Sequence, residues 1–122
     1  MLNLQIKETW LAVINWEDFE KVDVRVGTVV EAEPFPEARK PSIKLIVDFG
    51  PEVGTRKTSA QLTAHYEPEA LVGKQIVAVV NFPPKRIAGF VSEVLVLGVP
   101  DRNEEVVLLS PDREVPRGGR MF

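Results

Sequence analysis

The chain has no cysteine and a single histidine, His65. The absence of cysteine excludes disulfides, thiolate metal sites and thiol chemistry, and it is typical of a cytoplasmic protein. With only one histidine, we expect neither a histidine-based metal site nor a catalytic triad. We therefore predict no metal and no other cofactor.

Long apolar runs are also absent. No segment approaches the ~20 apolar residues that a membrane-spanning helix needs. Lys7 and Glu8 interrupt the N-terminal stretch where a signal peptide would have its apolar core. We therefore predict a cytoplasmic protein without a membrane-inserted segment.

The chain lacks an excess of basic residues. Its 15 Lys and Arg stand against 18 Asp and Glu, which gives a net charge of −3. This balance argues against nucleic-acid binding over the whole surface but allows a local basic patch on an acidic body. The 122 residues, 44% of them hydrophobic, predict one globular domain. We place this domain at residues 15–122. Residues 1–14 are an N-terminal extension that either packs on the body or a second subunit, or remains a partly ordered end.

Several short segments alternate between apolar and polar residues, as half-buried strands do. The first, residues 21–32, places Val22, Val24 and Val26 on one face, and its Gly27 predicts a bulge or bend. Asn15 predicts the N-cap of a single helical turn before it. The other predicted elements are strands at residues 42–50, 55–61, 74–82, 92–98 and 105–109 and a short helix at residues 68–71. This order predicts an all-β protein with one short helix, an OB-fold five-stranded Greek-key barrel with short N- and C-terminal extensions.

Two adjacent prolines, Pro83 and Pro84, separate the fourth and fifth predicted strands. Proline lacks a backbone N–H and has a fixed φ, so neither a helix nor a central strand continues through this pair. We therefore expect a stiff connector that presents Lys85 and Arg86 to a partner.

The basic residues gather where an OB-fold binds its ligands. Such folds bind across the second and third strands, between the strand 1–2 and strand 4–5 loops. Seven of the fifteen Lys and Arg fall at these places: Arg39, Lys40, Lys44, Arg56, Lys57, Lys85 and Arg86. We predict that they border one groove and bind RNA; the alternative is that charged loops are simply solvated.

Neutral polar and aromatic residues lie near the same groove. Ser59, Gln61, Asn81 and Ser92 either read a base edge or sugar or fix the backbone, for example around the proline pair. Phe35, Phe82 and Phe90 either stack on bases or pack in the core. If exposed, they form an apolar rim that binds unfolded peptide. No carboxylate is placed beside a nucleophile, so we predict that the protein is not an enzyme.

The chain also resembles a known family. The segments that carry the resemblance are DFEKVDVRVGTVVEAEPFPEARKP, TSAQLT, VVNFPPKRIAGFVSEVLVLG and VLLSPDREVPRGG. They resemble the CsaA family of small export-related chaperones. That family is built on the tRNA-binding domain also appended to methionyl- and phenylalanyl-tRNA synthetases. The segment NFPP…SEVL is specific to the CsaA branch, whereas the wider family is closer to N-L-x-P…S-x-G-M.

The resemblance implies an OB-fold homodimer with a tRNA-binding-type groove, terminal segments that help form the dimer, and a chaperone role through apolar surface. Carried over by position, the groove includes Lys44, Ser59, Asn81, Lys85 and Ser92, with Arg39 and Lys40 in the adjoining loop. The first functional hypothesis is a chaperone that binds unfolded or secretory preproteins for export. The alternative is a structure-selective tRNA-binding protein that acts in trans.

Overall fold

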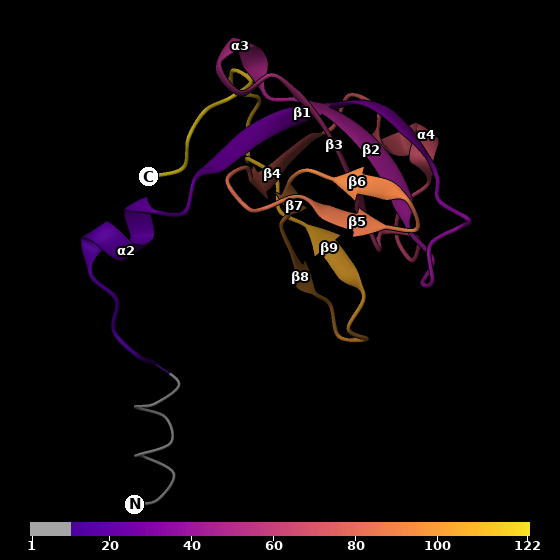
Figure 1. Ribbon diagram of the computed structural model, residues 1–122, viewed down its shortest axis with the longest axis horizontal. Helices are drawn as coiled ribbons and strands as arrows, with labels where there is room; N and C mark the ends of the chain where they lie inside the picture. The colour runs from indigo at the N-terminus through magenta and orange to yellow at the C-terminus, as the bar shows by residue number, and fades with distance from the viewer. Residues whose placement is uncertain (1–10) are drawn as a thin grey trace, which may run out of the picture.

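The computed structural model describes residues 11–122, which form a small β-barrel with additional β-hairpins (Figure 1). Residues 1–10, most of the predicted N-terminal extension, lie outside the described residues. The helices are short: α2 (Trp16–Glu20), α3 (Gly50–Val53) and α4 (Pro68–Leu71). The strands are β1 (Val24–Pro34), β2 (Ile43–Asp48), β3 (Thr55–Ala60), β4 (Gln75–Val79), β5 (Lys85–Ile87), β6 (Phe90–Ser92), β7 (Leu95–Val96), β8 (Gly98–Pro100) and β9 (Val106–Leu108).

The main sheet is antiparallel and has the strand order β3-β2-β1-β4-β7. The long central strand β1 pairs with β4 along its first part and with β2 along its second part. The sheet curls until the outer edge of β3 meets the chain after β6, where the Glu93 N–H donates to the Lys57 carbonyl at 2.8 Å. The predicted all-β barrel of OB type is confirmed.

The core follows from the alternation within the strands. In β2, the apolar Ile43, Leu45 and Val47 are buried, while the residues between them are half-buried. Side chains of a strand point alternately to its two faces, so one face of β2 lines the barrel interior. Phe49, directly after β2, and Leu71 of α4 are fully buried in the same cluster.

Gly27 does not produce the bulge that the sequence predicted. The register of β1 against β2 shifts between Val29 and Glu31, so the irregularity lies beyond Gly27. Gly27 instead permits a close approach of side chains to the backbone. A Cβ atom at this position would lie 2.5 Å from Val47 Cγ1 and 2.7 Å from Phe49 Cδ1. The absence of a side chain therefore lets β1 lie directly against the core.

The connector after the two prolines is a β-hairpin rather than a loop. β5 and β6 pair in the register Lys85↔Ser92 and Ile87↔Phe90. The turn between them, residues 88–89, has positive φ at both positions, which is the geometry of a type I′ turn. The predicted fifth strand, residues 92–98, is divided between the end of β6, β7 and the start of β8. In Figure 1 the β5–β6 hairpin crosses in front of the main sheet.

The C-terminal segment extends the sheet at the free edge of β1. Val26 exchanges two backbone hydrogen bonds with Gly118 and Gly119, at 2.8 and 3.0 Å, and the Met121 N–H donates to the Val24 carbonyl at 2.8 Å. The C-terminus and α2 therefore lie on the same side of the barrel (Figure 1).

Both helical predictions are confirmed. Asn15 caps α2 through a capping box with Asp18, and α4 occupies residues 68–71. The last predicted strand is β9, which pairs with β8 in a second hairpin. Among the described residues, no helix is both long enough and apolar enough to cross a bilayer.

Candidate ligand-binding groove

A groove of about 410 Å³ lies between the end of β3, the β5–β6 hairpin and β7, and we call it the central groove. Most of its wall is apolar and includes Phe82, Pro83, Ile87, Val94 and Leu95. The predicted site residues that line it are Ser59, Gln61, Phe82, Lys85 and Ser92. The fold therefore brings together residues from the third strand and from the connector, as the sequence predicted.

A smaller cavity of about 130 Å³, the Phe90 cavity, lies on the outer face of β2 and β3. Lys44, Lys57 and Phe90 line it, together with Glu31 and Glu33 of β1. The Nζ atoms of Lys44 and Lys57 lie 5.1 and 5.5 Å from the centroid of the Phe90 ring. Each contact of this kind is worth about 0.5–1 kcal/mol at an exposed site, so the ring holds both ammonium groups near each other.

Phe35 does not form part of an exposed rim. Its side chain is only 2% exposed, and its ring packs edge to face against Phe90 with the centroids 5.4 Å apart. Lys44 Nζ lies 4.6 Å from the Phe35 centroid. Phe35 therefore supports Phe90 from within the protein, which corrects its assignment to a peptide-binding surface. Phe82, by contrast, is 51% exposed at the mouth of the central groove.

Adjacent cations in β3 lie on opposite faces of the strand. Lys57 and Ser59 share the outer face, whereas Arg56 shares the inner face with the buried Thr58. Arg56 Nε donates to the Val53 carbonyl at 3.2 Å, at the end of α3. The structure thus places Lys57 at the Phe90 cavity and separates Arg56 from it.

The cations of β5 are separated in the same way. Lys85 and Ile87 line the central groove, while Arg86 between them belongs to the other face of the hairpin. Arg39 and Lys40 are exposed in the loop between β1 and β2 and line neither cavity. Three of the seven predicted cations, Lys44, Lys57 and Lys85, therefore line the cavities.

The seven predicted cations share an electrostatic property. Within residues 11–122, none of them forms an ion pair. The cations that do form ion pairs are Lys21, Arg25, Arg113, Arg117 and Arg120. The positive charge around the groove is therefore not neutralised by a described carboxylate in direct contact.

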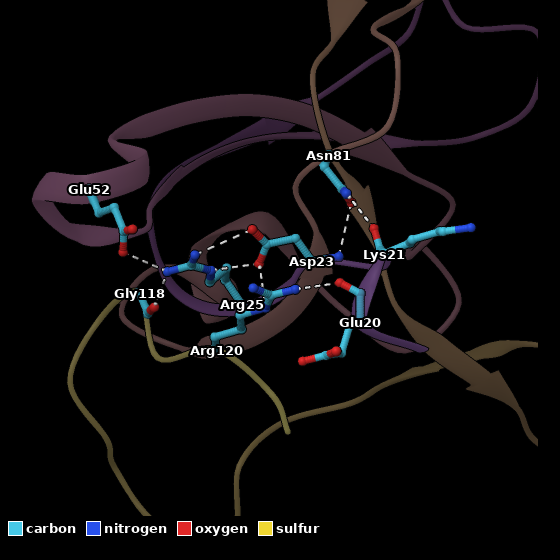
Figure 2. A network of polar contacts seen from close by, with 8 residues as sticks. All are labelled: Glu20, Lys21, Asp23, Arg25, Glu52, Asn81, Gly118 and Arg120. Carbon is cyan, nitrogen blue, oxygen red and sulfur yellow. Dashed lines mark hydrogen bonds and ion pairs between the residues drawn. The ribbon is translucent and has the colours of Figure 1, made fainter. Parts of the chain in front are cut away.

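Two of the paired cations, Arg25 and Arg120, meet at Asp23 just before β1 (Figure 2). Arg25 Nε and Nη2 donate to the two carboxylate oxygens of Asp23 at 2.7 and 3.3 Å. Arg25 Nη1 donates to Glu52 at 2.9 Å and to the Gly118 carbonyl at 3.0 Å, and Arg120 Nε lies 3.5 Å from Asp23. The hydrogen bonds from Arg25 lower the pKa of Asp23, and those to Asp23 raise the pKa of Arg25. This network ties the C-terminal segment to β1.

Asn81 belongs to this network rather than to a base-reading surface. Its Oδ1 accepts from the Asp23 N–H at 3.0 Å, and its Nδ2 donates to the Lys21 carbonyl at 2.7 Å (Figure 2). Asn81 therefore fixes the chain before β1 to the end of β4. These contacts agree with the second of the two predictions for Asn81, that it fixes the backbone.

Ser92 closes the barrel. Its buried hydroxyl lies 2.9 Å from Thr58 Oγ1 and accepts from the Ser59 N–H at 3.3 Å. Thr58 Oγ1 donates its single proton to the Val94 carbonyl at 2.8 Å, so Ser92 is the donor to Thr58. The Ser92 hydroxyl is therefore engaged within the barrel, whereas one of its two predicted roles was a contact to a base or sugar.

Glu93 lines neither cavity but holds the backbone of the cavity-lining Lys57, a role that the charge pattern did not indicate. Its carboxylate accepts from the Lys57 N–H at 2.9 Å, and its own N–H donates to the Lys57 carbonyl at 2.8 Å. The only sequence signal is its position between Ser92 and Val94, whose side chains turn into the barrel.

Residues 24–120 match the model of the putative tRNA binding domain. The chain belongs to the tRNA-binding-domain family. The chaperone CsaA of Bacillus anthracis is 58% identical, with a TM-score of 0.84, and the match covers 91% of this chain and 100% of that one. The CsaA chaperone of Picrophilus torridus is 46% identical, with the same TM-score and coverages of 90% and 100%. The predicted membership of the CsaA-like group is confirmed.

Methionine–tRNA ligases contain a similar domain. The enzyme of Methanococcus aeolicus is 42% identical over 108 residues, which are 88% of this chain but 15% of the ligase. The chain therefore spans about 15% of the length of the curated relatives that it matches. The match concerns a binding domain, and ligase activity is not carried over with it. Among the described residues, no group of three or more His, Asp or Glu side chains could hold a metal ion.

Proposed function

We propose that this protein is a non-enzymatic, CsaA-like chaperone, a cytoplasmic homodimer that holds unfolded or secretory preproteins before export. The observation that carries the proposal is the apolar wall of the central groove, with the exposed Phe82 at its mouth. An exposed apolar surface with a polar rim is typical of a protein-interaction site. The similarity to two CsaA chaperones supports the same reading.

The groove offers both kinds of contact that an extended polypeptide needs. Phe82, Ile87 and Leu95 accept apolar side chains, and each fully buried side chain contributes about 1.5–3 kcal/mol. Ser59 and Gln61 supply hydrogen-bonding groups along the same wall. Because one such contact is weak, retention of a client requires several apolar side chains or two grooves in a dimer.

Suppression of client aggregation, followed by light scattering, tests this proposal. We expect the unmodified protein to suppress scattering at a stoichiometric ratio of dimer to client. Phe82→Ser should lose most of this effect because it removes the exposed ring. Val72→Ser is the matched control, since Val72 is also 51% exposed but does not line the groove. Absence of suppression by the unmodified protein would contradict the chaperone proposal.

A second candidate function is tRNA binding in trans. It is favoured by the cations without ion pairs within residues 11–122 and by membership of the tRNA-binding-domain family. Lys44, Lys57 and Lys85 line the cavities, which supports their assignment as phosphate contacts in this proposal. If tRNA and peptide use the same surface, each should displace the other.

The salt dependence of tRNA binding distinguishes a cation that contacts a phosphate from one that lies away from the RNA. Lys57→Ala should weaken tRNA binding and reduce the slope of log K against log salt concentration by about 0.9, because one counterion fewer is released. Arg56→Ala removes the same charge one residue away on the inner face and should change the slope less. Equal slopes for both variants and the unmodified protein would contradict the assignment of Lys57 to RNA.

A further inference from the structure

The outer edge of β3 is closed by two side chains and one backbone N–H rather than by another strand. β3 is the terminal strand of the main sheet, so alternate N–H and C=O groups point away from β2. The Lys57 N–H donates to the Glu93 carboxylate, the Lys57 carbonyl accepts from the Glu93 N–H, and the Ser59 N–H donates to Ser92 Oγ. Glu93 thus satisfies both backbone groups of Lys57, as a residue of a neighbouring strand would.

The Glu93 carboxylate has no cationic partner among the described residues. Ser92, which precedes it, is the cross-strand partner of Lys85, and Lys57 is its hydrogen-bond partner. The fixed negative charge therefore lies at the backbone of Lys57, and Glu93 follows directly after the cross-strand partner of Lys85. Ser92 lines the central groove and Lys57 lines the Phe90 cavity, so Glu93 adjoins a lining residue of each.

We infer that Glu93 biases the charge preference of the groove: its fixed carboxylate weakens the binding of polyanions and leaves the binding of uncharged polypeptide segments unaffected. A phosphate chain that contacts both Lys57 and Lys85 passes close to this carboxylate and is repelled by it. An apolar peptide segment in the central groove carries no such charge. The inference rests on the proposed function, because it assigns polypeptide rather than RNA as the preferred ligand of the same groove.

The test uses Glu93→Gln in the full chain. The amide oxygen of Gln still accepts from the Lys57 N–H, so the edge of β3 stays closed and the unfolding midpoint should not change. Bulk tRNA and a single-stranded oligouridylate are the probes, with an unfolded client peptide of zero net charge measured in parallel. We expect Glu93→Gln to bind both RNAs about three- to tenfold more tightly at roughly 0.1 M salt, with the difference shrinking at higher salt. Peptide affinity should be the same as that of the unmodified protein.

Glu69→Gln in α4 is the control, because it makes the same change of charge on an exposed residue away from both cavities. Equal RNA affinities for the two variants, or weaker binding by Glu93→Gln, would overturn the inference while leaving the chaperone proposal intact. If the unmodified protein binds no RNA, the tRNA candidate fails. In that case the inference is still supported if Glu93→Gln binds oligouridylate and Glu69→Gln does not. It is overturned if neither variant binds oligouridylate. The chaperone proposal is tested independently of the RNA measurements: it fails if the unmodified protein does not bind the peptide.

Discussion

Lys57 and Arg56 carry the same charge one position apart, yet only Lys57 lines a cavity on the outer face. The strand alternation decides this difference, and the same holds for Lys85 and Arg86 in β5. From the sequence we predicted that all four cations border one groove, because the two members of each pair are adjacent and carry the same charge. At the scale of the residue, the face of the strand matters more than the local charge density.

Several polar residues are engaged in holding the barrel together. Asn81, Ser92 and Thr58 have hydrogen bonds to groups 33 to 60 positions away in the chain. No local pattern shows such partners, because they depend on which strands meet in space. The sequence therefore indicated that Asn81 and Ser92 matter but could not separate a binding role from a structural one.

The Asp23–Arg25 pair predicts a pH-dependent contribution to stability. Arg25 lowers the pKa of Asp23 in the folded protein, so this stabilisation is complete above the unfolded-state pKa, about 3.9. It is lost as the pH falls toward the lower folded-state pKa. Asp23→Asn should lower the free energy of unfolding at pH 7 by about 2 kcal/mol, because charged hydrogen bonds to Arg25 are lost.

Urea unfolding at a series of pH values measures this effect. The destabilisation caused by Asp23→Asn should shrink as the pH falls below about 4, where the unmodified protein loses the same interaction. Asp112→Asn is the control, since Asp112 is exposed and its contact with Arg113 is 3.8 Å long. It should change stability by less than about 0.5 kcal/mol at any pH. A constant destabilisation by Asp23→Asn down to pH 2 would contradict the assignment of the effect to the Asp23 charge.

At the scale of the element, the long strand β1 forms backbone hydrogen bonds with three neighbouring segments. It pairs with β4, with β2 and with the C-terminal segment. Its register against β2 shifts between Val29 and Glu31, while Gly27 makes room for Val47 and Phe49. The sequence indicated that β1 is irregular but placed the irregularity at the glycine.

Gly27→Ala should therefore destabilise the barrel by overpacking. The new methyl group would lie 2.5 to 2.8 Å from side-chain carbons of Val47 and Phe49, and such insertions cost about 1–3 kcal/mol. Gly119→Ala is the matched control, because its nearest atom would lie 3.6 Å away, an ordinary contact distance. Thermal unfolding distinguishes the two variants. Equal midpoints would show that the Gly27 backbone can move away from the core without cost.

The β5–β6 hairpin is the element that the sequence described least well. The two prolines correctly predicted that no strand runs through residues 83–84, although β4 already ends at Val79, three residues before its predicted end. The positive φ values at Ala88 and Gly89 form a tight turn that folds the connector onto the barrel. Alanine is an uncommon residue at positive φ, so the local sequence gave no strong hairpin signal there. Contacts of Phe90 with Phe35, Lys44 and Lys57 hold the hairpin in place.

At the scale of the whole molecule, the two ends of the described chain form an exposed apolar surface. Trp16, Phe19 and Val22 lie beside Met121 and Phe122 around a shallow cavity of about 280 Å³. The Phe122 side chain is fully exposed, and the largely exposed Trp16 ring packs at a tilt against the Phe19 ring, with the centroids 5.4 Å apart. Contiguous exposed apolar residues favour association with another surface, which supports the homodimer in the proposed function.

Trp16→Glu should dissociate the proposed homodimer, because it buries an unpaired charge in an apolar interface. Light scattering at micromolar concentration should give twice the 13.6 kDa chain mass for the unmodified protein and a lower mass for the variant. Val72→Glu introduces the same charge at an exposed residue remote from the chain ends and should stay dimeric. A monomeric unmodified protein would contradict the homodimer, and a dimeric Trp16→Glu variant would place the interface elsewhere.

The sequence by itself determined strands β1 to β4 and β9, the helices α2 and α4, and the barrel. These follow from alternation within segments of 5 to 12 residues and from turn residues, which are local properties. The family was indicated separately, by the resemblance of whole motif segments. The tertiary structure alone decided which cations line a cavity, why Phe35 is buried, and how Ser92 and Asn81 are used. It also placed the Glu93 carboxylate on the backbone of Lys57, 36 positions away. The physical reason is that a hydrogen bond or a packed ring requires two particular groups to meet, and closure of the barrel alone brings these groups together.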